Sequence, residues 1–136
     1  LVLTSPPYGG TYDYARHHAR RLAWLELDDR RLRALELGAR RDATVTSWDR
    51  DVRAMLHAMR GVTHRDALLV LVIGDAEVGG RRIAAPAQLE RLGSELGLRC
   101  LASASQPRPE WRGSRARAPR EEHLVVLGAG VRGPRA

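Results

Sequence analysis

The sequence predicts an α/β protein in which helices pack on a layered sheet with a parallel part. Apolar runs of strand length alternate with segments whose apolar residues recur at helical spacing. The most hydrophobic run, Ala67–Ile73, has the length and continuity of a strand covered on both faces, as strands of parallel sheets are. The last two apolar runs are separated only by a loop, which favours a closing antiparallel hairpin.

Four elements are expected in the first half of the chain. They are a strand ending at Leu3, a helix from Tyr14 to about Leu27, a helix over Arg31–Leu37 and a helix from Trp48 to Arg60. Two prolines stop the strand, and a glycine follows each of the last two helices. The last helix has the clearest pattern, because Val52, Leu56 and Met59 recur at helical spacing.

The second half continues the alternation of strands and helices. Its expected elements are a strand over Ala67–Ile73, a turn at Gly79–Gly80, a helix from Pro86 to Leu96, and strands over Leu98–Ser103 and Glu122–Leu127. A Pro- and Arg-rich loop, Gln106 to Arg120, separates the last two strands. We interpret residues 1–128 as one domain and residues 129–136 as a frayed tail.

Charge is the strongest compositional signal. The chain has 23 Lys plus Arg, all of them Arg, against 16 Asp plus Glu, which gives a formal net charge of +7. The planar guanidinium suits phosphates and base edges, so this excess favours a nucleic-acid partner. Codon bias in a GC-rich genome explains the absence of Lys, but it does not explain the net positive charge.

Other compositional features exclude several classes of protein. The single cysteine, Cys100, excludes an internal disulfide, and we expect it to be a buried, inert thiol. No apolar stretch approaches the roughly 20 residues that span a membrane. Because no signal peptide is visible either, a cytoplasmic location without a membrane partner is expected. Residue 1 is Leu and lies inside an apolar run, which indicates a fragment.

The segment Ser5–Pro6–Pro7–Tyr8, directly after the first strand, carries the chemistry. An exocyclic amine of a base is a poor nucleophile because its lone pair is delocalised into the ring. An enzyme that methylates this nitrogen must hold it with hydrogen-bond acceptors. The Ser5 hydroxyl and the Pro6 carbonyl are two such acceptors, the two prolines stiffen the turn, and Tyr8 offers a ring for stacking a flipped base. The alternative interpretation is a structural turn.

These four residues resemble the catalytic motif of the S-adenosylmethionine-dependent amino-methyltransferases, which is written as Asp, Asn or Ser, then Pro–Pro, then an aromatic residue. The serine version is similar to that of cytosine-N4 DNA methyltransferases. The segment Gly9–Tyr14 is similar to the residues directly after the motif in bacterial DNA methylase-like proteins. Val72–Gly80 resembles the fifth strand and following turn of that family, and Glu121–Val126 resembles its last strand.

The resemblance implies part of a Rossmann-like methyltransferase fold, from the fourth strand onward, with a mostly parallel sheet and a closing antiparallel hairpin. It also implies S-adenosylmethionine as cofactor. The family binds this cofactor with elements that come before the matched part, so the cofactor-binding residues stay unknown. The segment Gly74–Gly80 is glycine-rich but follows the wrong strand. We therefore expect an amino-terminal half to be supplied in cis or by another chain, and the isolated fragment to be inactive.

Nucleic acid is the expected partner, with DNA preferred to RNA. The candidate contact residues are aromatic and arginine side chains after the motif and in the later loop: Tyr12, Tyr14, Arg16, Arg108, Trp111, Arg112 and Arg115. Arginines interleaved with aromatic residues suit phosphate contacts together with stacking on a base. A solvated, arginine-rich loop is the alternative for the later segment.

No metal site is expected. His17 and His18 are adjacent on a predicted helix and point about 100° apart, so they do not face one ion easily. The remaining histidines, His57, His64 and His123, show no spacing pattern. Asp75 follows a strand, where it either reaches the active-site cleft or caps a turn.

Methylation of an exocyclic base amine in DNA is the function predicted, with cytosine N4 as first choice and adenine N6 next. An RNA guanine-N2 methyltransferase shares the motif and the fold. A basic α/β module that binds nucleic acid without catalysis is the alternative from another class, and in that case Ser5–Tyr8 is only a stiff turn.

Overall fold

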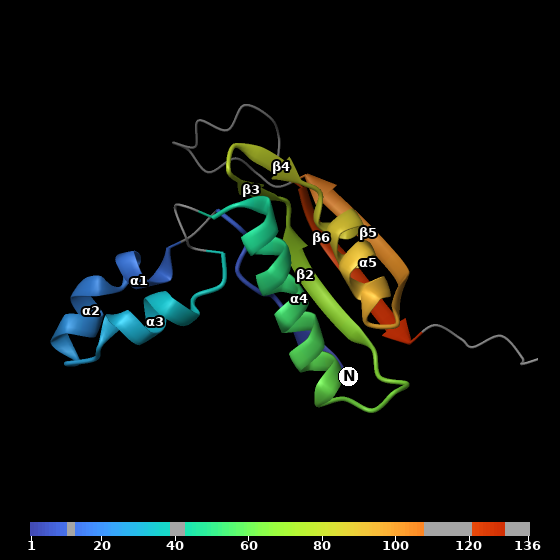
Figure 1. Ribbon diagram of the computed structural model, residues 1–136, viewed down its shortest axis with the longest axis horizontal. Helices are drawn as coiled ribbons and strands as arrows, with labels where there is room; N and C mark the ends of the chain where they lie inside the picture. Colours follow the sequence, from blue (N-terminus) through green and yellow to red (C-terminus); the bar gives the residue numbers. More distant parts are fainter. Residues whose placement is uncertain (11–12, 39–42, 108–120, 130–136) are drawn as a thin grey trace, which may run out of the picture.

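The computed structural model has a mixed α/β fold and describes residues 1–10, 13–38, 43–107 and 121–129. Its elements are β1 (Val2–Thr4), α1 (Tyr14–His17), α2 (Ala19–Trp24), α3 (Asp29–Leu35), α4 (Val45–Gly61), β2 (Leu69–Gly74), β3 (Ala76–Val78), β4 (Arg81–Ile83), α5 (Ala85–Glu95), β5 (Leu98–Pro107) and β6 (Glu121–Ala129). Figure 1 shows α4 and α5 lying side by side across one face of the sheet that contains β2, β6 and β5.

The four-stranded sheet has the order β1-β2-β6-β5. β1 pairs with β2 in parallel, whereas β6 pairs antiparallel with both β2 and β5. The closing antiparallel hairpin is therefore confirmed. The expectation of a mostly parallel sheet is wrong for the described part, where β1–β2 is the single parallel pairing, because β6 returns between β2 and β5 instead of adding at an edge.

The core lies between this sheet and the helices α4 and α5. Leu69, Leu71 and Ile73 of β2 share a face with Val125 and Leu127 of β6, and all five side chains are buried. They pack in one cluster with helix residues that recur at helical spacing: Trp48, Val52 and Leu56 from α4, and Leu89 and Leu92 from α5. The helical pattern that predicts α4 is thus the pattern that fills the core.

The opposite face of the sheet is apolar but less covered. Val70 and Val72 of β2 are half-buried, and Leu124 of β6 is 44% exposed. Leu3, whose partner on β2 is Val70, is 69% exposed. The expectation that the strand over Ala67–Ile73 is covered on both faces is therefore wrong in the described part of the chain. Continuity of the apolar run does not distinguish a covered face from an apolar face that is open.

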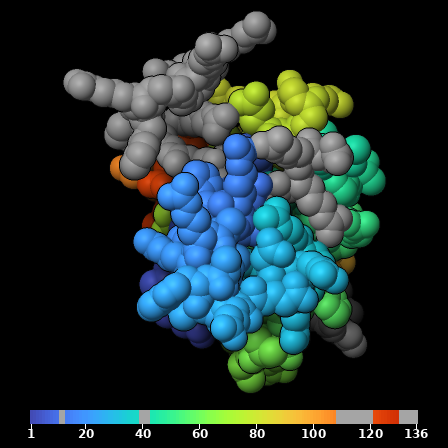
Figure 2. Space-filling view, turned by 90° about the vertical axis from the view of Figure 1, so that its left-hand side faces the viewer, coloured from blue at the N-terminus to red at the C-terminus, as the bar shows by residue number. Residues whose placement is uncertain are grey.

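Three short helices, α1 to α3, gather on one side of the molecule (Figures 1 and 2). The helix expected from Tyr14 to Leu27 divides at His18 and ends at Trp24. Trp24 is 84% exposed. The buried carboxylate of Glu36 accepts hydrogen bonds from the backbone N–H groups of Tyr14 and Ala15, which holds the start of α1 against the end of α3.

The turn predicted at Gly79–Gly80 is confirmed. It joins β3 and β4 as a two-residue hairpin, and both glycines have positive φ, +57° and +72°. The two strands were not predicted, because each has only three residues. Gln106 and Pro107, expected in a loop, belong to β5, and Ala129, expected in the tail, belongs to β6. Cys100 is half-buried rather than buried.

Two glycines with nearly equal φ test how tightly the chain packs after the first strand. Gly10 has φ +68°, and a Cβ there would overlap the backbone carbonyl oxygen of Glu77, whereas a Cβ on Gly80 at φ +72° meets nothing within 4 Å. We expect Gly80→Ala to cost about 1–2 kcal/mol from backbone strain alone. We expect Gly10→Ala to have the same backbone strain and, in addition, a steric cost of about 1–3 kcal/mol from the overlap with Glu77. Urea unfolding of both variants measures the difference, and equal destabilisation would contradict the close approach of Gly10 to β3.

Candidate functional site

The polar residues of interest gather at one edge of the four-stranded sheet. β1 and β2 are parallel, so Ser5 and Asp75, which follow them, lie at the same edge. β6 begins there and β5 ends there, because β6 is antiparallel to both of its neighbours. In open α/β sheets, ligands bind outside the carboxyl ends of the parallel strands. This edge is therefore the candidate functional site.

Tyr8 is fixed in two ways at this edge. Its ring lies on Gly74, where a Cβ would come within 2.7 Å of Tyr8 Cδ2. Its hydroxyl donates a hydrogen bond of 2.6 Å to Glu122 Oε1. Gln106 Nε2 donates to the other carboxylate oxygen of Glu122 at 3.1 Å. Because Gly74, Glu122 and Gln106 are paired across β2, β6 and β5, they share the less covered face of the sheet with Tyr8.

The residues between β1 and Tyr8 differ in exposure in a way that suits a binding turn. Ser5 is exposed, Pro6 is buried and Pro7 is half-buried. The turn is therefore anchored through Pro6, whereas Ser5 lies at the surface. Fixed φ angles at both prolines limit the conformations in which the Ser5 hydroxyl is presented.

The chain after Tyr8 is held by α4 and β3. A Cβ on Gly9 would lie 2.9 Å from the ring of Trp48, and the Gly9 carbonyl accepts a hydrogen bond of 3.1 Å from the N–H of Glu77. The Gly10 N–H donates to the Gly38 carbonyl at 3.0 Å. Trp48 is itself fixed by donating from Nε1 to Gln88 Oε1 at 3.1 Å. These contacts tie the motif to the core.

Asp75 is the centre of a second network, on the helix-covered side of the same edge. Its side chain is almost fully buried. Oδ2 accepts hydrogen bonds from Arg82 Nε at 2.9 Å and from Arg82 Nη2 at 2.6 Å. Oδ1 accepts from the N–H of Ala85 at 3.1 Å and contacts His123 Nε2 at 2.9 Å. Since the N-cap residue of α5, Ala84, has no side-chain acceptor, Asp75 supplies the missing cap from another element.

The protonation of this network follows from its geometry. Burial by itself would raise the pKa of Asp75, but hydrogen bonds from Arg82, Ala85 and His123 outweigh burial and lower the pKa below its ordinary value. The ionised Asp75 carboxylate accepts a hydrogen bond from His123 Nε2, so the imidazole carries a proton on this nitrogen. The other ring nitrogen, Nδ1, lies 2.8 Å from Ser105 Oγ and therefore accepts the serine hydroxyl when the imidazole is neutral.

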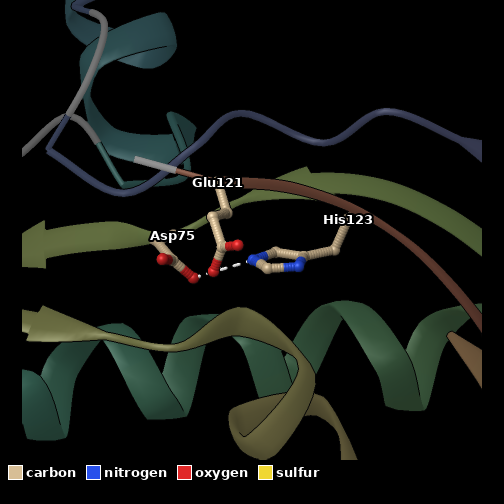
Figure 3. Close-up of side chains that lie close together, drawn as sticks. All are labelled: Asp75, Glu121 and His123. Carbon is tan, nitrogen blue, oxygen red and sulfur yellow. Dashed lines mark hydrogen bonds and ion pairs between the residues drawn. The ribbon is translucent and has the colours of Figure 1, made fainter. Parts of the chain in front are cut away.

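Asp75, Glu121 and His123 form a group with metal-ligand chemistry (Figure 3). One potential ligand atom of each lies within 4.8 Å of the others. However, the four acceptor positions of the Asp75 carboxylate are already taken by donors of the protein. An ion would have to displace Arg82 or His123, so this group is better explained as a satisfied polar network.

The predicted nucleic-acid contacts are only partly described. Tyr14 and Arg16 are exposed on α1, and the Tyr14 ring stacks on His18 with 6.3 Å between ring centroids. The other predicted contact residues lie outside the described residues: Tyr12, Arg108, Trp111, Arg112 and Arg115.

Sequence reasoning missed the partners that fix the site. Glu122, Gln106 and Gly74 hold Tyr8, and His123 and Ser105 extend the network of Asp75. The sequence offers one signal for these partners, the doublet Glu121–Glu122 before an apolar strand. Charged residues at the end of a strand face either the solvent or a polar partner. Asp75 was expected either to reach the active-site cleft or to cap a turn; the structure shows its carboxylate capping the start of α5 instead, through the N–H of Ala85.

Comparisons with protein-family models, with curated proteins and with solved structures found no match. In the described ranges, none of the helices combines the length and apolar character needed to cross a membrane. The site is therefore interpreted from its own geometry and from its motif.

Replacing Asp75 with Asn tests the buried network. At pH 7 the amide cannot accept from four donors, so we expect a loss of about 3 kcal/mol in the free energy of unfolding. Because folding lowers the pKa of Asp75, the ionised carboxylate stabilises the folded state at every pH above its ordinary pKa of 3.8. This stabilisation is lost as the pH falls from there through the lower pKa of the folded state. Urea unfolding at pH 7 and at successively lower pH should show the difference from wild type shrinking below about pH 4. A difference that does not change with pH would contradict this account.

Proposed function

We propose that this chain forms the target-binding half of an S-adenosylmethionine-dependent methyltransferase that modifies an exocyclic amine of a nucleic-acid base. Cytosine N4 in DNA is the first choice of target and adenine N6 the next. The observation that carries the proposal is the Ser5–Pro6–Pro7–Tyr8 turn at the carboxyl end of β1, with the Tyr8 ring fixed on Gly74 and its hydroxyl on Glu122.

The geometry supports specific roles for the residues of the turn. The hydroxyl of Ser5, an exposed residue, and the Pro6 carbonyl accept hydrogen bonds from the amine, which localises its lone pair for attack. Tyr8 stacks against the base after it leaves the duplex. Because Glu122 and Gly74 hold the ring before the base arrives, stacking requires little reordering of the side chain.

The arrangement of elements is consistent with the fold that the motif implies. A parallel strand pair carries the motif at its carboxyl edge, two helices cover one face, and an antiparallel β5–β6 pair closes the sheet. The net charge of +7 gives the chain attraction for a polyanion. Exposed Tyr14 and Arg16 on α1 offer stacking and phosphate contacts.

The described residues do not fit S-adenosylmethionine by themselves. Gly9 is buried against Trp48, and Gly10, although exposed, lies so close to the Glu77 carbonyl that a Cβ would not fit there. Gly79 and Gly80 form the two-residue turn between β3 and β4. We infer that residues outside the described part, in cis or on another chain, hold the methyl donor.

Methyl transfer by the protein expressed from its complete coding sequence tests the proposal. Labelled S-adenosylmethionine is offered with duplex DNA and, separately, with transfer RNA, and the labelled base is identified. We expect label on a base amine of DNA. Label on guanine N2 of the transfer RNA would move the assignment to the RNA alternative, and label on neither would contradict methyl transfer.

Substitutions in the turn test the residue roles. Ser5→Ala removes an acceptor used in the transition state, so we expect about a 100-fold loss of kcat with nearly unchanged DNA binding. Tyr8→Ala should lose stacking as well, worth about 1–3 kcal/mol, whereas Tyr8→Phe keeps the ring. Ser94→Ala is the matched control, because Ser94 is an exposed serine of α5 whose hydroxyl donates to the Arg91 carbonyl of the same helix. Wild-type kcat in Ser5→Ala would leave the non-catalytic binding module as the better explanation.

A further inference from the structure

A serine of β5, a histidine of β6 and the aspartate that follows β2 are connected in a line by hydrogen bonds at the helix-covered side of the sheet edge. Ser105 Oγ of β5 lies 2.8 Å from Nδ1 of His123 on β6. Nε2 of the same ring lies 2.9 Å from Oδ1 of Asp75, which follows β2. Both distances are within the range of strong hydrogen bonds. The proposed methyl transfer uses none of these three side chains.

The exposure of the three residues follows the order of the line. Asp75 and His123 are buried, with 2% and 4% of their surface exposed, whereas Ser105 is exposed. Ser105 is therefore the member of the line that lies at the surface, while the ring and the carboxylate behind it are shielded from water. Shielding strengthens the hydrogen bond between the imidazole and the carboxylate.

Asp75 is in turn held rigidly from its far side. Arg82 of β4 and the N–H of Ala85 fix the carboxylate, so its orientation toward the ring is set by the hairpin and by α5. An ionised carboxylate at Nε2 fixes the tautomer that carries its proton there, which leaves the lone pair of Nδ1 facing Ser105. A base within hydrogen-bond reach of a hydroxyl, with a third group that orients the base, is the arrangement that activates serine for attack on carbonyl groups.

We propose that Ser105 is the nucleophile of an acyl-transfer site, with His123 as its general base and Asp75 as the positioning residue, and that small activated esters are its substrate class. This site is independent of the proposed methyl transfer.

The proposed reaction is balanced by the residues present and by water. Ser105 Oγ attacks the carbonyl carbon, and its proton moves to His123 Nδ1. The carbon–oxygen bond to the leaving alcohol then breaks, and the proton on Nδ1 is passed to that alcohol. Water then attacks the carbonyl carbon of the acyl-serine while His123 Nδ1 takes its proton. The bond between that carbon and Ser105 Oγ breaks, the proton on Nδ1 returns to Oγ, and a carboxylic acid is released.

Labelling with a fluorophosphonate tests the proposal, since this probe phosphonylates activated serines with loss of fluoride. Ser103 is the matched control, because it is an exposed serine on the same strand and the same face, but its cross-strand partner is Val125 instead of a histidine. We expect mass spectrometry to find the phosphonyl group on Ser105. Ser105→Ala should abolish labelling, and Ser103→Ala should label at the wild-type rate.

His123→Gln measures the contribution of the base, and we expect the labelling rate to fall by at least about 100-fold. Its thermal unfolding is recorded alongside, because the ring is buried. If this variant does not fold, the rate of p-nitrophenyl acetate hydrolysis by wild type, Ser105→Ala and Ser103→Ala decides the question. Hydrolysis lost only in Ser105→Ala supports the site. Equal rates of hydrolysis in all three proteins would overturn it. So would the absence of fluorophosphonate labelling in folded wild type, or equal labelling of Ser103 and Ser105.

Discussion

The buried carboxylate of Asp75 is the constraint on which the candidate site depends. A charged group so deeply buried is tolerated only when its acceptor positions are filled, and here the donors come from β4, from the start of α5 and from β6. The requirement to satisfy one side chain therefore positions three elements against the end of β2. Gly74, directly before Asp75, is the last residue of β2 and the residue on which the Tyr8 ring lies.

The two networks at this edge are separated by the sheet. Successive residues of a strand point to opposite faces, so Glu122 of β6 faces Tyr8 while His123 faces Asp75. One strand thereby places a carboxylate beside the Tyr8 hydroxyl on one face and an imidazole beside the Ser105 hydroxyl on the other. A shift of one residue in the pairing of β6 with β2 would disrupt both, and the apolar residues of β6 oppose that shift because Val125 and Leu127 fill the core.

Local patterns in the sequence predicted the elements that build the core. The recurrence of Val52, Leu56 and Met59 predicted α4, and the apolar run ending at Ile73 predicted β2, because burial against the sheet requires those patterns. Paired glycines predicted the turn between β3 and β4. The motif at Ser5–Tyr8 was correctly placed after a strand, but its chemistry stays a prediction.

The contacts that shape the site were beyond sequence reasoning, because they join residues far apart in the chain. Tyr8 and Glu122 are 114 positions apart, and Asp75 and His123 are 48 apart. Their pairing depends on β6 lying between β2 and β5, which no local pattern specifies. Val70 and Val72 were wrongly expected to be covered for a similar reason. The apolar run shows that both faces of β2 are apolar, but it does not show which elements cover them.

Photo-crosslinking tests most directly whether Tyr8 receives the target base, and it does not depend on a methyl donor. DNA carrying 5-iodocytosine is bound to the protein and irradiated, and the crosslinked residue is located by mass spectrometry. The account predicts a crosslink at Tyr8 that is retained in Tyr8→Phe and lost in Tyr8→Ala, since the probe reacts with an aromatic ring stacked on the base. DNA that binds with wild-type affinity but crosslinks only at other residues would contradict the assignment of the Ser5–Tyr8 turn as the site of base recognition.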